Sequence, residues 1–124
     1  MLKTQKNKVL LGIALVLLGS LLFASMALAD ADPDHSTFIA SPDTLPADNT
    51  TEGYLIATVK DNLDNPLSDQ TVTVVQIGGS GNAVITPASV MTDGWGEAYF
   101  TVKSPTVELA HFRATINGTI NISN

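Results

Sequence analysis

The fold is decided by residues 54–75, which read YLIATVKDNLDNPLSDQTVTVV. Apolar and polar residues alternate on both sides of a polar centre, and the apolar positions are Leu55, Ala57, Val59, Val72 and Val74. This period of two predicts two half-buried strands that contribute to one core. The centre predicts a tight loop, because Asp and Asn side chains bond to nearby backbone groups and Pro66 lacks a backbone donor.

The first 29 residues have the pattern of a secretory signal peptide. Lysines at positions 3, 6 and 8 precede an uncharged run at residues 9–29, which ends in the small-x-small pattern Ala27-Leu28-Ala29. We therefore expect cleavage after Ala29. The alternative is an uncleaved membrane anchor, since the uncharged run is long enough to span a bilayer. In both cases everything from Asp30 onward is expected to be exported.

Charge and cysteine content narrow the class of function. Three of the 6 basic residues lie in the signal segment, so the exported part carries 3 basic against 12 acidic residues and a formal charge of −9. Such a domain has no basic patch to neutralise phosphates, which excludes nucleic acid as the expected partner. Cysteine is absent. A single small domain must therefore be held together by its hydrophobic core rather than by disulfides.

The rest of the chain predicts short strands rather than helices. Residues 30–35 are expected to be a flexible acidic lead-in. Further strands are predicted at residues 36–40, 83–86, 89–92, 98–103, 110–116 and 119–123. Prolines after the first of these place it at a sheet edge. Residues 92–98 predict a hairpin turn, and Asn117-Gly118 predicts another. Many short alternating strands indicate an all-β sandwich. Its expected core is Leu55, Ala57, Val59, Val72, Val74, Phe100, Val102, Phe112, Ala114 and Ile116.

Three separated motifs extend this pattern over most of the exported chain. The first is Thr58-Val59-Lys60-Asp61 with Asn65-Pro66-Leu67 and Gln70-Thr71-Val72, the second is Thr92-Asp93 with Gly96 and Ala98, and the third is Ala114-Thr115-Ile116-Asn117-Gly118. In order and spacing they resemble a group-1 bacterial immunoglobulin-like domain, the module of invasin and intimin-type adhesins. The resemblance implies an immunoglobulin-like Greek-key β-sandwich of about seven strands at residues 36–124. It also implies an exported spacer or binding module whose partner is a protein or glycan at a cell surface.

Trp95 is the only tryptophan of the chain and lies in a predicted turn. We expect its ring to fold back over the end of the sandwich and cap the core, because an indole buries a large apolar area. The alternative is an exposed ring that contacts a sugar or protein ligand, together with Tyr99 and Tyr54.

The remaining candidate residues favour structural interpretations. His35 lies in the lead-in and His111 on an outward strand face, and neither has the companions of a metal site. Asp61, Asp64 and Asp69 are carboxylates of the kind that bind calcium, but Asp in turns ordinarily bonds to backbone. No catalytic signature is present. We therefore expect no metal, no cofactor and no enzyme activity.

Three functional hypotheses remain. The first is a non-enzymatic exported Ig-like module with a structural or adhesive role at the cell envelope. The second is a subunit of an extracellular polymer or matrix, in which edge strands of neighbouring copies add to each other's sheets and the protein self-associates. The third is a small carbohydrate-binding module that uses Trp95, Tyr99 and Tyr54. Membrane contact is expected only through residues 9–29, if they are not removed.

Overall fold

The computed structural model describes residues 28–123. Apart from its last two residues, the predicted signal peptide lies outside this range, so its cleavage stays a prediction. Every regular element in the described range is a β-strand. Within the same range there is no helix of the length and apolarity needed to cross a membrane.

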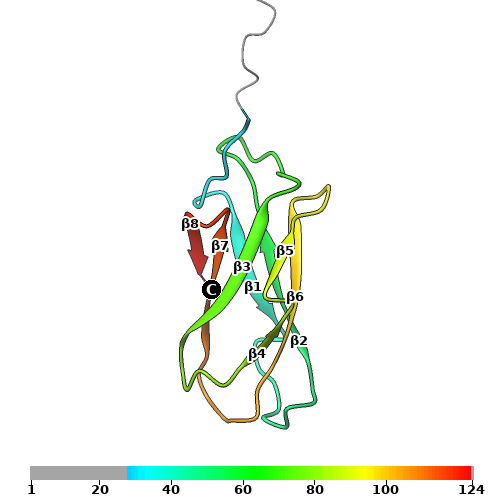
Figure 1. Ribbon diagram of the computed structural model, residues 1–124, viewed down its shortest axis with the longest axis vertical. Coiled ribbons are helices and arrows are strands. Elements are labelled where there is room, and N and C mark those ends of the chain that lie inside the picture. The colour runs from blue at the N-terminus through cyan, green and yellow to red at the C-terminus, as the bar shows by residue number, and fades with distance from the viewer. Residues whose placement is uncertain (1–27, 124) are drawn as a thin grey trace, which may run out of the picture.

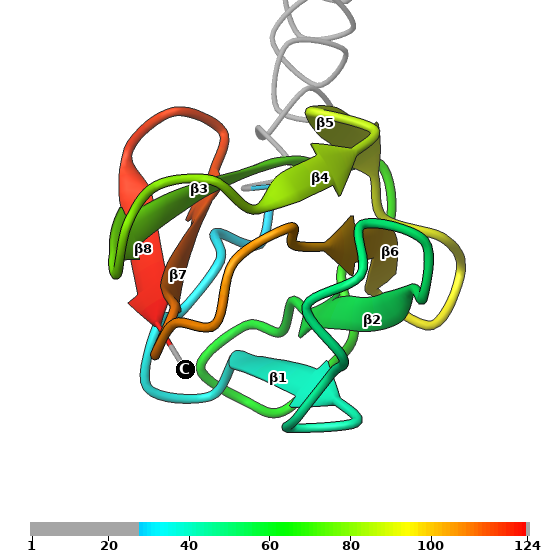
Figure 2. The same ribbon diagram turned by 90° about the horizontal axis from the view of Figure 1, so that it is seen from below.

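Within residues 28–123, eight strands form two four-stranded sheets that face each other (Figures 1 and 2). The first sheet contains, in spatial order, β1 (Thr37–Ser41), β2 (Gly53–Thr58), β6 (Glu97–Lys103) and β4 (Val84–Thr86). The second contains β5 (Ser89–Met91), β3 (Thr71–Gly78), β7 (His111–Ile116) and β8 (Ile120–Ser123). All strand pairs are antiparallel. The predicted all-β sandwich is confirmed, and β1 lies at a sheet edge as expected.

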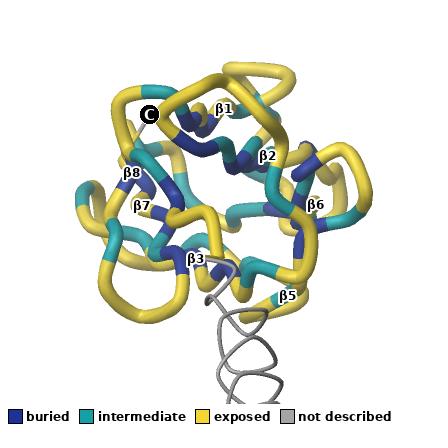
Figure 3. The backbone as a smooth tube through the Cα atoms, turned by 90° about the horizontal axis from the view of Figure 1, so that it is seen from above, coloured by how far each residue is buried: buried dark blue, intermediate teal, exposed yellow. Residues whose placement is uncertain are grey.

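The core lies between the two sheets, where the inward residues of each strand meet (Figure 3). All ten core residues expected from the alternation are buried, and Leu55, Ala57, Val59 and Val72 are fully inaccessible. Ala31, Phe38, Ala98 and Ile122 complete the cluster. Among the described residues, this cluster lies wholly within residues 31–122.

The acidic lead-in, which we expected to be flexible, packs against the sandwich. Ala31 is only 6% exposed and joins the core. The backbone N–H of Asp32 donates to the carbonyl oxygen of Lys60 at 2.8 Å, and the N–H of Ser36 donates back to Asp32 at 3.0 Å. A small apolar residue between aspartates therefore anchors the segment, and the half-buried Asp32 carboxylate accepts the Asp34 N–H at 2.8 Å.

The two predicted hairpin turns have different outcomes. Asn117 and Gly118 both have positive φ, and the N–H of Thr119 donates to Ile116 at 3.1 Å, which confirms a hairpin between β7 and β8. The turn at residues 92–98 instead leads from β5 in the second sheet to β6 in the first. The hairpin expected there is wrong, because sequence identifies the turn but not which sheet each flanking strand joins.

Candidate functional site

The solvent-facing side of the first sheet carries a row of large apolar side chains. Ile39 of β1 lies opposite Ile56 of β2, and Ile56 lies opposite Tyr99 of β6. Directly opposed residues of neighbouring strands place their side chains on the same face, about 5 Å apart. Ile39 and Tyr99 are exposed and Ile56 is half-buried. The three side chains therefore form one continuous strip across three strands.

Tyr54 extends this strip towards the other end of the sheet. It lies opposite Thr101, two residues along β6 from Tyr99. Diagonal neighbours of this kind are about 7–8 Å apart, within reach of aromatic rings. Tyr54 is 54% exposed and Tyr99 is 49% exposed, so both rings meet solvent. We call the surface made by Ile39, Tyr54, Ile56 and Tyr99 the tyrosine face.

A polar border adjoins the tyrosine face where β6 begins. The Tyr99 hydroxyl donates a short hydrogen bond to the Glu97 carboxylate, two residues away on the same side of β6. That bond raises the pKa of Tyr99 above its ordinary value. Glu97 in turn lies opposite Thr58 of β2. The face thus combines apolar contact area with a fixed phenol and a carboxylate, which suits it to binding another molecule rather than to covalent chemistry.

Trp95 projects into solvent and does not cap the core, so our expectation for it is wrong. Its side chain is 75% exposed. The inward position of the turn belongs to the next residue, Gly96, which is buried and whose carbonyl oxygen accepts the Val59 N–H at 2.8 Å. A Cβ at position 96 would lie 2.5 Å from the Val59 carbonyl oxygen, so the backbone packs closely against β2 and the loop after it at this point. The structure therefore brings Tyr54 and Tyr99 together on one sheet, with Trp95 in the turn that leads into β6.

The outer face of the second sheet has a different character. Its exposed apolar residues include Val75 and Ile77 of β3 and Met91 of β5, and Val75 lies opposite Arg113 of β7. His111 is exposed, as its outward position predicted. His35 lies 3.3 Å from the Asp32 carboxylate, measured from Nδ1 to Oδ2. No group of three or more His, Cys, Asp or Glu residues in the described part is arranged to hold a metal ion.

Comparison with known proteins agrees with this architecture. The sequence profile of the family "Bacterial Ig-like domain (group 1)" matches residues 35–124. The chain belongs to this family. No curated protein sequence matches this group 1 Ig-like chain closely enough to count as a relative.

Solved structures of adhesins share the fold of this group 1 Ig-like chain. The D00–D0 domain of intimin is 28% identical with a TM-score of 0.61, and the match covers 68% of this chain and 42% of that one. A C-terminal fragment of intimin, solved in complex with the intimin-binding domain of the translocated intimin receptor, is 21% identical (TM-score 0.62; 77% and 31% covered). Invasin, described as a bacterial integrin-binding protein, is 22% identical (TM-score 0.55; 71% and 18% covered). The chain thus spans less than half the length of these structures.

Proposed function

We propose that this protein is an exported, non-enzymatic Ig-like module that binds a protein partner at a cell surface through the tyrosine face. The observation that carries the proposal is the exposed strip of Ile39, Ile56 and Tyr99 with Tyr54 beside it. A contiguous apolar surface rimmed by polar residues is typical of an interaction site. Family membership supports the adhesive role, since two of the similar structures are named for the protein receptors that they bind.

The composition of the face favours a protein over a glycan. Tyr54 and Tyr99 suit both, because aromatic rings stack on sugars and also anchor protein interfaces. Ile39 and Ile56 offer a sugar neither a stacking surface nor a hydrogen bond, whereas they fit the apolar centre of a protein interface. The formal charge of −9 after the signal segment disfavours strongly anionic partners. A small carbohydrate-binding module is therefore the second candidate, and it rests on the two tyrosines alone.

A pair of matched double variants tests the proposal. Tyr54→Ser with Tyr99→Ser removes the aromatic part of the tyrosine face, and Val75→Ser with Ile77→Ser removes exposed apolar area from the opposite sheet. Beads coated with residues 28–124 would be assayed on arrays of cell-surface proteins and of glycans. We expect binding to protein targets that the tyrosine variant loses by about tenfold or more, as interface anchors do, while the control variant keeps it. Equal binding by both variants, or binding to glycans only, would contradict the proposal.

A further inference from the structure

Three triplets of the form Asn-x-Ser/Thr occur in the chain, and their asparagines are Asn49, Asn117 and Asn121. Such a triplet is the attachment signal for an N-linked glycan when it lies on the surface of an exported protein. The triplet alone does not identify a modified residue, because Asn is common in turns and Thr in strands. The contacts of the three Asn side chains differ, and these contacts distinguish the triplets.

The side chain of Asn117 is occupied by hydrogen bonds to a distant segment. Its amide nitrogen donates to the side-chain oxygen of Gln70 at 2.7 Å, and its side-chain oxygen accepts the N–H of Thr71 at 3.0 Å. Asn117 thereby joins the turn after β7 to the start of β3. The nitrogen that would carry a sugar is already bonded, so attachment there would break a contact of the fold.

Asn121 lies within a strand rather than a loop. It belongs to β8 and pairs with Thr115 of β7, whose hydroxyl donates to the Asn121 side-chain oxygen at 2.9 Å. A modifying enzyme would have to bend this triplet into its own cleft, and the paired backbone resists that. The triplet becomes available only when β8 separates locally from β7.

Asn49 differs from both, because it lies in the connection between β1 and β2 and its side chain is free. Asn49 is exposed, and within residues 28–123 its side chain makes no hydrogen bond. Its φ of 58° is a left-handed conformation, which Asn adopts more readily than most residues. The side-chain nitrogen Nδ2 of Asn49 is therefore open to solvent on a surface connection.

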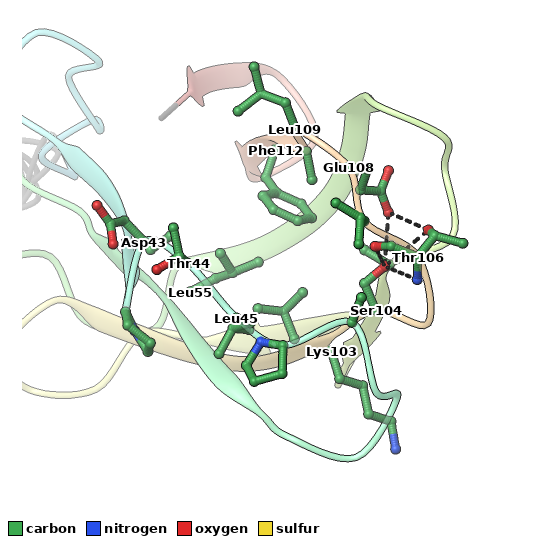
Figure 4. A pocket seen from close by; sticks show the side chains of 18 residues that line it. Asp43, Thr44, Leu45, Leu55, Lys103, Ser104, Thr106, Glu108, Leu109 and Phe112 are labelled. Carbon is green, nitrogen blue, oxygen red and sulfur yellow. Dashed lines mark hydrogen bonds between the residues drawn. The ribbon is translucent and has the colours of Figure 1, made fainter.

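The connection keeps its shape without the Asn49 side chain. Leu45, earlier in the same connection, lines an apolar cavity that opens between the two sheets at the end of the sandwich opposite the lead-in (Figures 1 and 4). The backbone N–H of Asn49 donates to the carbonyl oxygen of Ser104 at 3.1 Å, which ties the connection to the segment after β6. A group attached to Nδ2 would thus disturb neither contact.

The hydroxyl of Thr51, which completes the triplet, is accessible as well. It donates to the carboxylate of Asp48 at 2.6 Å, and both residues are exposed. An exposed hydrogen bond is exchanged for one to another molecule at little net cost. The triplet at Asn49 therefore offers an unbonded amide and a releasable hydroxyl on one surface loop.

We propose that Asn49 carries an N-linked glycan that is attached after export. The donor is a sugar carried on a lipid phosphate or diphosphate. Nδ2 of Asn49 forms a bond to the anomeric carbon of the sugar, the bond from that carbon to the phosphate oxygen breaks, the lipid phosphate leaves, and the amide loses one proton. The inference rests on the export that the proposed function includes, but it does not depend on the tyrosine face.

Peptide mapping of the protein isolated from the cells that produce it tests the proposal. Trypsin cleaves after Lys60, Lys103 and Arg113, so the peptide that ends at Lys60 contains Asn49, and the peptide that begins at Ala114 contains the other two triplets. We expect the mass of a glycan on the first peptide only, and fragmentation should assign it to Asn49. An exported chain whose first peptide is unmodified, or whose glycan is on the second peptide instead, would overturn this inference and leave export standing. A chain that is not exported would overturn both.

Three variants produced in the same cells identify the attachment site. Asn49→Asp removes the amide but keeps a residue that tolerates positive φ, and Thr51→Ala removes the hydroxyl of the triplet. Both should lose the glycan completely. Thr50→Ala changes only the middle position and should keep it. Circular dichroism checks that each variant is folded. A glycan that persists in Asn49→Asp, or that Thr50→Ala loses as fully as Thr51→Ala, would overturn the proposal.

Discussion

The Asp61 carboxylate accepts hydrogen bonds from Asn65 through both the backbone N–H, at 2.9 Å, and the side-chain amide, at 3.0 Å. It also accepts the N–H of Leu63 at 2.8 Å. These bonds, above all that from the Asn65 side chain, lower the pKa of Asp61. Asp61 is buried, although it lies in a polar loop. One side chain thus organises the loop that carries the chain from β2 in the first sheet to β3 in the second.

Asp61→Ala should destabilise the domain through this loop. The change leaves the donors of Leu63 and Asn65 without their acceptor, and unsatisfied donors of this kind lower stability markedly. We expect the melting temperature to fall by about 5–10 °C, given the usual sensitivity of a domain of this size. Asp34→Ala, in the exposed part of the lead-in, is the matched control and should change it by less than about 3 °C. Equal effects would show that Asp61 has no special role.

Gly96 and Gly118 form a second matched pair. Both have positive φ, of 76° and 74°, which any residue with a Cβ adopts at a cost. A Cβ on Gly96 would lie 2.5 Å from the carbonyl oxygen of Val59, whereas one on Gly118 would meet nothing within 4 Å. Gly118→Ala should therefore lower stability by about 1–2 kcal/mol, and Gly96→Ala by several kcal/mol more because backbone must move. Denaturant unfolding measures both, and a similar loss in the two variants would contradict the packing described for Gly96.

The lowered pKa of Glu108 predicts how the stability of the fold depends on pH. Burial raises its pKa, but hydrogen bonds from Ser80, Gln76 and Ser104 outweigh this and lower the pKa from 4.5 to about 2. A carboxyl whose pKa is lower in the folded state stabilises the fold above its unfolded pKa. That contribution is lost as the pH falls from about 4.5 towards 2.

The melting temperature should therefore fall on acidification through this window, and the fall should be smaller in Glu108→Gln. Asp48 and Asp61 also have lowered pKa values, so the variant should reduce the pH dependence without abolishing it. Thermal melts at about pH 7, 5 and 3 make the comparison. If the variant and the parent lose the same number of degrees, the hydrogen bonds to Glu108 do not stabilise the fold.

The fluorescence of Trp95, the only tryptophan of the chain, reports whether its ring is exposed to solvent. Because its ring is largely in water, its fluorescence emission should shift little when the domain is unfolded by denaturant. Trp95→Ala should change the melting temperature by less than about 3 °C, since little apolar area is lost. A large red shift on unfolding, or a variant that melts much earlier, would instead indicate a ring that caps the core.

Val59 and Trp95 show which side-chain positions the sequence predicts and which it does not. Val59 lies in a regular alternation, and all ten core residues that we predict from that local period are buried. Trp95 lies in a turn, where orientation depends on the backbone of Gly96 and on its contact with Val59. Local sequence likewise does not predict that β5 and β6, on either side of this turn, join different sheets.

The candidate surfaces show the same limit. The sequence offers Tyr54 and Tyr99 as ligand contacts only in the alternative hypothesis, and their place on one face beside Ile39 and Ile56 requires the strand register. The hydrogen bonds of Glu108 join it to Gln76 and Ser80, about 30 positions earlier in the chain. The cavity likewise draws on segments that are distant in sequence. No local pattern identifies such contacts.

The most direct test of an exported surface module is the intact mass and location of the protein in the cells that produce it. Surface labelling of intact cells, followed by mass spectrometry of the labelled fraction and the medium, determines both. We predict a chain that begins at Asp30 and is accessible from outside the cell. A chain that retains Met1 and is protected from the label inside the cell would contradict export, and with it the proposed role at the cell surface.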